Sequence, residues 1–399
     1  MMMIKKKLKI RNSKFEIRNS RRRGVALLVV LFIVMVITIL SLGYLSQSDV
    51  ELACGQNMIL RTQMDYLSES GLEHARGLIL NAQDVGSEYW AGATGQQLVA
   101  GSYDYYDVEV VRDDSDPTNR CNYIIDCNSY RLKSGEKIGR SSIIAELRLD
   151  PCIAYWTGSS TTISGRITIN GDVYCSGDLT NNGIIGGDAF ASGTITGANI
   201  EGHKSGLVAQ PPVVWPGLVS SDFSPTYYIG SIAYQAQLVD VNIPPLSNFV
   251  PSAANPAGIY YSSSDVNIPG GVNITGMLVV NGTLRIGGAN NVISAVKNFP
   301  ALLVNGEVVI GDGGTLAIKG LAQIGQRVVI NAGAENVDID VIGGLFIANG
   351  GIDGAISSTV AVDVTAGPAI GSIQTWPVAG TAKKWRPAAG AFFRSIKRK

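Results

Sequence analysis

A run of residues without charge, from Val25 to Ser48, is the longest apolar pattern in the chain. Drawn as a helix, it carries leucine, valine and isoleucine on all sides, unlike the one-sided stripe of an amphipathic surface helix. At about 1.5 Å rise per residue the run makes about 36 Å of helix, enough to cross a hydrocarbon core of about 30 Å. The pattern predicts a transmembrane helix over residues 24–48.

Helical spacing continues beyond this run. Residues 49–82 contain no proline, and apolar side chains recur there at the intervals of a helix: Leu52, Ile59, Tyr66, Leu67, Leu72, Leu78 and Ile79. We expect one continuous helix, whose first half lies in lipid and whose second half packs on a domain outside the membrane.

Basic residues precede the apolar run and predict its orientation. Residues 1–23 carry ten Lys or Arg side chains against one acidic residue, and Arg21, Arg22 and Arg23 lie directly before the run. The positive-inside rule then keeps the N-terminus cytoplasmic and places the rest of the chain on the periplasmic or extracellular side of the inner membrane. A secretory signal peptide has an apolar region of only about 7–15 residues, so a retained single-pass anchor is expected.

Alternating apolar and polar residues predict a small antiparallel sheet within residues 83–152. The alternating segments are rich in Val, Ile and Tyr: residues 103–111, 121–126 and 143–149. Turn residues separate them at 113–117 and 133–136. The acidic turn at 113–117 offers carboxylates for calcium, but such a cluster is more typical of a solvated turn.

Short apolar segments punctuated by Gly, Asn and Asp follow in two blocks, residues 153–204 and 260–370. Two motifs recur there: GDVYCSG at 171–177 and GDAFASG at 187–193, then LVVNG at 278–282 and LLVNG at 302–306, with looser copies ending at Gly325 and Gly350. Repeats of this kind, with periods near 20–25 residues in the second block, predict a parallel β-solenoid (β-helix) whose copies stack to form a common core. Gly and Asn tolerate the positive φ of its sharp corners.

Two further segments interrupt or follow the repeats. Residues 205–259 hold eight of the fifteen prolines together with several aromatic residues. We expect an ordered excursion along the solenoid flank, with a short helix near residues 229–239, because proline at this density excludes central strands. The basic, aromatic tail at 371–399 is expected to cap the last coil, or else to meet lipid or an acidic partner.

The distribution of charge excludes some functions. The formal net charge is zero, but residues 24–382 hold 15 basic and 31 acidic side chains. A nucleic-acid binder would spread basic charge over a folded face, so no nucleic-acid partner is expected. The two histidines, His74 and His203, are distant from each other and no phosphate-binding loop is present. No cofactor, metal site or catalytic residue is predicted.

Asp172 and Asp188 are weak candidates for a ligand site in the repeats. They occupy equivalent positions in the two GD motifs, so a solenoid places them in register. Stacked carboxylates could bind a cation or a sugar, as in solenoid enzymes that cleave polysaccharides, but aspartate is also a corner-forming residue.

Five cysteines leave the disulfide pattern open. Cys121 and Cys127 could bridge if the residues between them turn, and separate buried thiols are the alternative. An exported domain permits disulfides.

Two motifs resemble a known family. Arg21 to Leu28 (RRRGVALL) resembles the class III signal of type IV pilins and pseudopilins, and Tyr66 to Ala75 (YLSESGLEHA) is similar to a helix of PilX-type pilus assembly proteins and K-class type II secretion minor pseudopilins. The resemblance implies that a prepilin peptidase cuts between Gly24 and Val25 and that the new terminus is methylated. Major pilins carry Glu at the fifth mature position, where this chain has Val29. That departure implies a minor or tip subunit.

The sequence therefore favours a membrane-anchored structural subunit rather than an enzyme. Its expected fold is a long N-terminal helix with a small antiparallel sheet, followed by a parallel β-solenoid. Its expected partners are other pilin-like subunits, prepilin peptidase and membrane lipid. The alternative is an unprocessed single-span anchor that displays a solenoid for adhesion, surface-polysaccharide binding or self-association.

Overall fold

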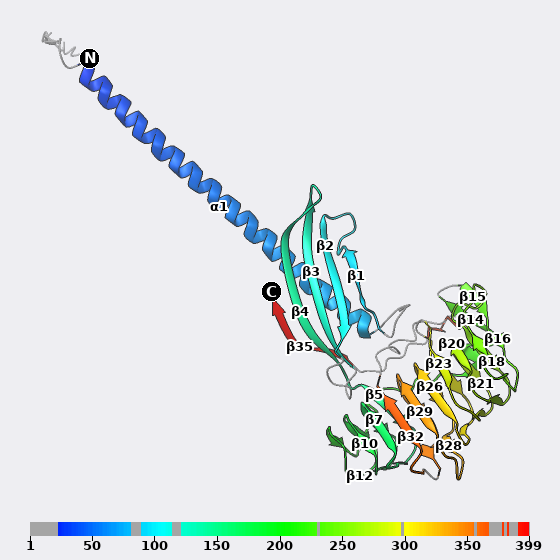
Figure 1. The fold of residues 1–399 in the computed structure, drawn as a ribbon. Helices are drawn as coiled ribbons and strands as arrows, with labels where there is room; N and C mark the ends of the chain where they lie inside the picture. The colour runs from blue at the N-terminus through cyan, green and yellow to red at the C-terminus, as the bar shows by residue number, and fades with distance from the viewer. Residues whose placement is uncertain are drawn as a thin grey trace, which may run out of the picture. The chain divides into compact units, whose positions relative to one another are not determined.

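The computed structural model describes residues 23–80, 89–113, 121–229, 232–296, 299–354, 357–366, 377–378, 381–382 and 390–398. The chain divides into two compact units, residues 1–62 and 63–399. One long helix, apolar in its first half, is followed by a strand-rich region with mostly parallel sheets (Figure 1). The predicted continuous helix is confirmed as α1 (Arg23–Leu80).

The first sheet is antiparallel and has five strands. In spatial order they are β1 (Gly92–Gln96), β2 (Asp104–Arg112), β3 (Asn122–Lys133), β4 (Glu136–Asp150) and β35 (Gly390–Arg398). The three alternating segments of the sequence form β2, β3 and β4. Ser134 and Gly135, both with positive φ, make the turn between β3 and β4.

The last turns of α1 pack on one face of this sheet. Its buried apolar side chains are Met64, Leu67, Leu72, Ala75 and Ile79. Two hydroxyl groups of the sheet fix the contact: Ser129 Oγ donates to the carbonyl oxygen of Met64 (2.7 Å), and Ser141 Oγ donates to Asp65 Oδ1 (2.6 Å). This part of α1 therefore belongs to the folded domain.

Residues 390–398, the longest described part of the C-terminal tail, join the antiparallel sheet rather than capping the strand stack as the sequence predicts. Strand β35 pairs antiparallel with β4, from Gly390 opposite Asp150 to Arg398 opposite Ile143. Arg398 also contacts Asp65 and Glu69 of α1. Its basic and aromatic residues are those of an edge strand, where Lys and Arg discourage further pairing. Before β35 lies one short antiparallel pair, β33 (Pro377–Val378) and β34 (Thr381–Ala382).

The remaining large sheets are parallel. The ten-stranded sheet has the order β13 (Lys204–Ser205), β11 (Ala189–Ala191), β8 (Asp172–Cys175), β5 (Ile153–Thr157), β30 (Leu345–Ile347), β27 (Ala322–Ile324), β24 (Leu302–Val304), β21 (Met277–Val280), β18 (Ile259–Ser262) and β16 (Gln237–Leu238). The eight-stranded sheet has the order β10 (Ile184–Ile185), β7 (Ile167–Asn170), β32 (Ala361–Thr365), β29 (Asp338–Ile342), β26 (Thr315–Lys319), β23 (Asn291–Ser294), β20 (Asn273–Thr275) and β17 (Asn248–Phe249).

Two shorter parallel sheets complete the region. The five-stranded parallel sheet has the order β19 (Val266–Ile268), β22 (Leu284–Ile286), β25 (Val308–Ile310), β28 (Val328–Ile330) and β31 (Ile352–Asp353). The three-stranded sheet has the order β12 (Ile195–Gly197), β9 (Leu179–Asn181) and β6 (Thr161–Ile163).

The chain visits these sheets in rotation, and we call one such set of three strands a layer. The copies found in the sequence are neighbours in space: Ala189 pairs with Val173, and Leu302 pairs with Leu278. Inward side chains such as Leu302 and Val304 are fully buried. The repeats thus stack their apolar residues on one another, as the periodicity predicts.

The spatial order of the layers differs from their order along the chain. The first layer (β5, β6, β7) lies beside the last one, since β5 pairs with β30 and β7 pairs with β32 (Figure 1). From there the chain proceeds to β13 at one end of the ten-stranded sheet. It resumes at β16, at the other end, and returns layer by layer to β30. The last layer of the chain therefore lies in the middle of the stack, between the layers that precede and follow it in space.

The Pro-rich segment connects the two ends. Residues 208–227, here the covering segment, pack on the outer face of the ten-stranded sheet. Their buried side chains, Val213, Leu218, Phe223 and Tyr227, lie against sheet residues that include Trp156, Leu303 and Phe346. Both faces of its central strands are thus buried, and β21 and β24 are accordingly continuous apolar runs.

The short helix expected near residues 229–239 is not present in the described part of that range. Strands β14 (Thr226–Ile229) and β15 (Ile232–Gln235) form an antiparallel pair instead, and the nearest helical turn is the short 3-10 helix η1 (Ser220–Asp222). Tyr227 and Tyr234 stack across the pair with ring centroids 5.7 Å apart. Aromatic cross-strand pairs of this kind favour a hairpin over a helix.

Candidate functional site

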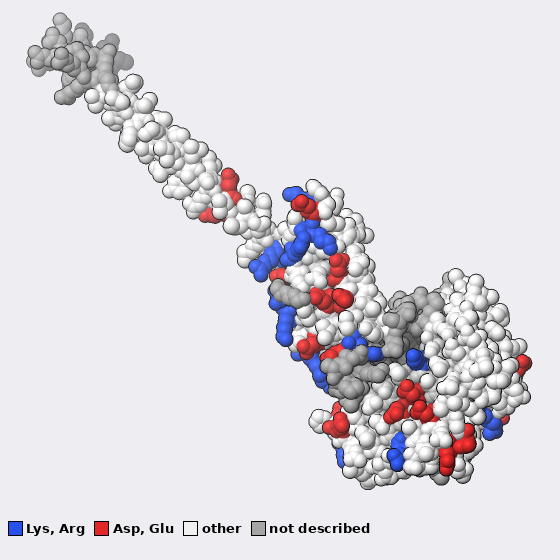
Figure 2. Space-filling view, in the orientation of Figure 1, with Lys and Arg blue, Asp and Glu red and all other residues white. Residues whose placement is uncertain are grey.

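The first half of α1 exposes an apolar surface that water alone would not favour. Nearly all of its side chains from Val25 to Leu45 are solvent-exposed in the isolated chain, with Leu27 72% and Phe32 61% exposed. The helix is long and apolar enough to cross a membrane. Figure 2 shows almost no charged side chains along this part of the helix. A membrane interior would cover such a surface.

The residues of the predicted cleavage site lie at the start of this helix. Arg23 is the first residue of α1, and Gly24 and Val25 lie in its first turn. Arg21 and Arg22 are outside the described residues. Cleavage between Gly24 and Val25 stays a prediction.

Gly71 allows α1 to approach the sheet closely. A Cβ atom built at this position would overlap the sulfur of Cys127 and lie 2.9 Å from Cδ2 of Tyr106. Tyr106 in turn places its hydroxyl 3.0 Å from Nδ1 of His74, one helical turn farther along. The glycine within YLSESGLEHA is therefore a point of close approach between helix and sheet.

The predicted bridge between Cys121 and Cys127 is wrong. Cys121 is joined to Cys152, with their Cα atoms 6.4 Å apart, and Cys127 is a buried free thiol whose pKa is raised to about 12 by burial. Cys121 and Cys127 flank an extended stretch of β3, which holds them about 20 Å apart at about 3.3 Å per residue. The expected turn at 133–136 would have pointed to the correct disulfide partner. It pairs β3 with β4 and so brings the end of β4, next to Cys152, close to Cys121.

Asp172 and Asp188 come together, as their equivalent positions predict, and both carboxylates bind backbone. Asp172 Oδ1 accepts a hydrogen bond from the N–H of Asp188 (2.8 Å), and Asp188 Oδ1 accepts one from the N–H of His203 (2.7 Å). Each aspartate thus holds the corner of the next layer. A role in cation or sugar binding for this pair stays a prediction.

Asp172 has a perturbed environment. It is 2% exposed, and Oδ2 accepts a second hydrogen bond from the N–H of Cys152 (2.7 Å). Burial raises the pKa of its carboxyl to about 6, against the lowering effect of the two backbone hydrogen bonds. The residue lies beside the Cys121–Cys152 disulfide, where the chain passes from the antiparallel sheet to the parallel ones. The protonation state of this carboxyl therefore affects the stability of that junction.

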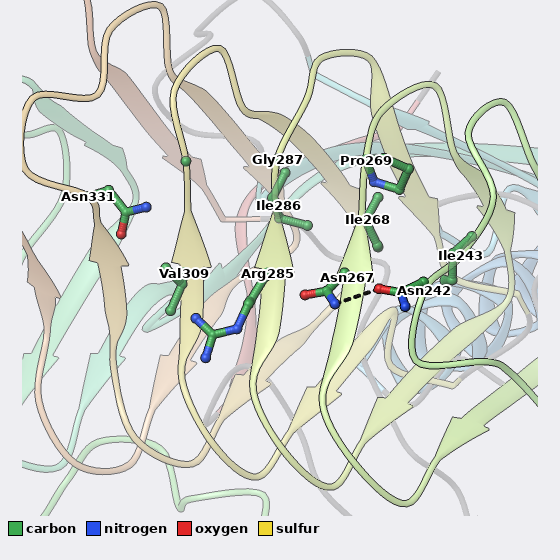
Figure 3. Close-up of a pocket in the computed structure, with 11 residues that line it drawn as sticks. Asn242, Ile243, Asn267, Ile268, Pro269, Arg285, Ile286, Gly287, Val309 and Asn331 are labelled. Atoms are coloured by element: carbon green, nitrogen blue, oxygen red, sulfur yellow. Dashed lines mark hydrogen bonds between the residues drawn. The ribbon is translucent and has the colours of Figure 1, made fainter.

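A pocket of about 280 Å³, lined by apolar residues together with three asparagines and one arginine, opens on the outer face of the five-stranded parallel sheet (Figure 3). Its floor is a row of outward side chains in register across three neighbouring strands: Asn267, Arg285 and Val309. Gly287 and Gly311 line one side without a side chain, and Asn331 and Pro269 also line the pocket. Asn242 closes the end and accepts a hydrogen bond from Asn267 Nδ2 to its Oδ1 (2.7 Å).

The sequence analysis missed this pocket. Its polar residues are spread from 242 to 331, and each lies alone between apolar neighbours, so no local motif marks them. The available signal was the middle position of successive repeats, where Asn267 and Arg285 replace the valines of later copies. Once the repeats are in register, these side chains fall side by side.

A second, larger recess of about 520 Å³ lies where the first and last layers meet. Hydroxyl side chains line it, including Thr161, Thr162 and Thr180, together with the carboxylates of Asp178 and Asp353. It differs from the first pocket in carrying negative rather than positive charge. Within the described residues no group of three or more His, Cys, Asp or Glu is placed to hold a metal ion.

Comparison with known proteins adds little. No family model and no curated protein matches the chain. Among solved structures, the competence-associated pilin ComZ from Thermus thermophilus is similar at 10% sequence identity and a TM-score of 0.27, over 85% of this chain and 97% of that one. A TM-score this low carries no argument about fold or function.

Proposed function

We propose that this chain is a pilin-like structural subunit, a minor component of a type IV pilus or of a type II secretion pseudopilus. The carrying observation is one helix with two environments: an exposed apolar half of membrane length, and a second half packed on an antiparallel sheet through Gly71. The basic residues before Val25 support a cytoplasmic N-terminus and an inner-membrane location.

In this proposal the parallel sheets are the sides of a β-solenoid displayed outside the membrane. Their rotation of strands and in-register stacking support that description. The role is structural, without a catalysed reaction. Its partners are lipid, prepilin peptidase and the apolar helices of other pilin-like subunits.

The N-terminal sequence and mass of the protein isolated from membranes of its native host test the proposal. The expected product begins at an N-methylated Val25. A second arm places cysteine at Leu31, in the apolar half of α1, and seeks cross-links to other pilin-like subunits.

A retained leader without such cross-links would overturn the proposal. The chain would then be a simple membrane anchor for an interaction domain, which is the alternative the sequence left open. Cleavage of a polysaccharide, lost in Asp172→Ala or Asp188→Ala, would overturn the non-enzymatic role.

A further inference from the structure

We propose that the pocket around Arg285 binds an acidic sugar unit of a polysaccharide. Its composition carries the inference. Among its eleven lining residues Arg285 is the only charged one, and three asparagines accompany it. The inference concerns a ligand of the displayed domain and does not depend on cleavage or assembly of the N-terminal helix.

The guanidinium of Arg285 has donors to offer. Its described ion pair is a 3.8 Å approach to Asp265 Oδ2, beyond hydrogen-bond length, and its side chain is 51% exposed. Asp265 uses its other oxygen for the N–H of Thr283 (2.8 Å). A guanidinium has five N–H donors arranged to bind a carboxylate in bidentate fashion. A ligand carboxylate is therefore the natural partner for this side chain.

The surroundings of Arg285 favour hydroxyl groups. The side-chain amides of Asn242, Asn267 and Asn331 each combine a carbonyl acceptor with NH₂ donors, and a sugar hydroxyl both donates and accepts. Val309 and Pro269 supply apolar surface for the C–H groups of a ring. A volume of about 280 Å³ lies just below the usual range of small-ligand pockets, about 300–1,000 Å³, so it suits one ring rather than a long segment.

The surface position of the pocket suits a unit within a chain. The pocket is built on the outer face of the sheet, in the row Asn267, Arg285 and Val309. A polymer can therefore enter and leave at its rim. A nucleic acid is a poorer match, because it binds through many phosphate contacts. This pocket has one positively charged side chain, in a part of the chain with net negative charge.

Arg327 provides a matched control for Arg285. It directly precedes β28 of the same sheet, its side chain is 50% exposed, and it is paired with Glu307 (2.7 Å) and Asp353 (3.5 Å). It is not among the residues that line the pocket. Removing either arginine changes the net charge of the domain equally.

The test is isothermal titration calorimetry of the full-length protein in detergent micelles with short oligomers of acidic sugars. Galacturonate, glucuronate and sialate probes are compared with neutral oligosaccharides of equal length. At least one acidic probe is expected to bind, with neutral ones weaker. Arg285→Gln is expected to weaken that binding by about tenfold or more, the effect of losing a charged hydrogen bond. Arg327→Gln is expected to leave it within about twofold, and Asn267→Ala to weaken it.

Three results would overturn the proposal. They are no binding of any acidic probe, equal binding of acidic and neutral probes, and an equal loss in the two arginine variants. Inorganic phosphate and a short DNA duplex are titrated in parallel, and Arg285-dependent binding tighter than that of the sugars would assign the pocket to phosphate chemistry instead. Circular dichroism of each variant checks that the fold is retained.

Discussion

At the scale of single residues, the absence of a side chain at Gly71 determines how closely α1 packs against the antiparallel sheet. Replacing it with alanine is expected to destabilise the protein by about 1–3 kcal/mol, because the added methyl group overlaps Cys127 and overpacks the contact. Thermal unfolding of the full-length protein in detergent measures the change. Gly77→Ala is the control, since a Cβ there meets no atom within 4 Å, and alanine favours a helix by up to about 1 kcal/mol. Equal effects at both positions would contradict the packing account.

The buried carboxyl of Asp172 predicts a pH-dependent stability. Its folded-state pKa of about 6 lies above its ordinary value of 3.8, so the folded protein binds this proton more tightly than the unfolded chain. The contribution is fully present below about pH 4 and is lost as the pH rises through 6, amounting to about 3 kcal/mol.

Chemical denaturation of wild type and Asp172→Asn between pH 4 and 7 measures this contribution. The variant is expected to be less stable at pH 4, because an amide cannot accept from both N–H groups, but to lack this part of the pH dependence. Asp312→Asn is the control, because Asp312 Oδ1 accepts one corner N–H (Glu335, 2.8 Å) from an exposed position. An unchanged slope in Asp172→Asn would exclude Asp172 as the source.

At the scale of elements, the covering segment buries the outer face of the ten-stranded sheet, a role that helices have in most parallel sheets. Trp215 lies 4.7 Å from Trp156 and 6.2 Å from Phe346 between ring centroids. Trp215→Ala is therefore expected to cost about 2 kcal/mol, less than for a fully buried aromatic residue because Trp215 is partly exposed. The adjacent Val214→Ala, at a side chain 73% exposed, should change stability by less than about 0.5 kcal/mol.

Unfolding in guanidinium and the binding of a hydrophobic dye report on this contact. A Trp215→Ala protein that retains wild-type stability, or that exposes no new apolar surface, would show that the covering segment adds nothing to the sheet.

Local sequence patterns predicted most of the elements but not their order in space. The apolar run gave α1, alternation gave β2 to β4, and repeats such as LVVNG identified strands that stack. Those repeats are nearly equivalent, so they do not say that β5 pairs with β30 rather than forming an end. Likewise nothing local distinguishes Gly390–Arg398 as a strand, because an edge strand pairs on one side and is selected by its neighbour β4. The pocket follows the same rule: it depends on lateral register, which a linear pattern does not contain.

At the scale of the whole molecule, the parallel sheets are an insertion between two neighbouring strands. Asp150 at the end of β4 pairs with Gly390 at the start of β35, so both ends of the insertion lie side by side. Replacing residues 151–389 with a two-residue Asn-Gly turn, together with Cys121→Ser because its disulfide partner Cys152 is removed, is expected to leave α1 and the antiparallel sheet folded, since that turn joins adjacent antiparallel strands.

Protease resistance and circular dichroism of this shortened chain in detergent measure the outcome. A matched chain that also lacks β35 is expected to be less resistant, since it loses the pairing with β4 and the contacts of Arg398 with α1. A shortened chain that fails to form the sheet, with β35 present, would show that the insertion is required for folding.

The meeting of the first and last layers has a consequence for biosynthesis. Tyr155 leaves the ribosome early, but its partner Leu345 follows about 190 residues later, which is about 10–40 s at about 5–20 residues per second. During that interval one edge of β5 is open, and β4 lacks β35 until the end of the chain emerges. A polypeptide interrupted anywhere before that point displays unpaired strand edges, by which quality-control proteases distinguish it from the finished product.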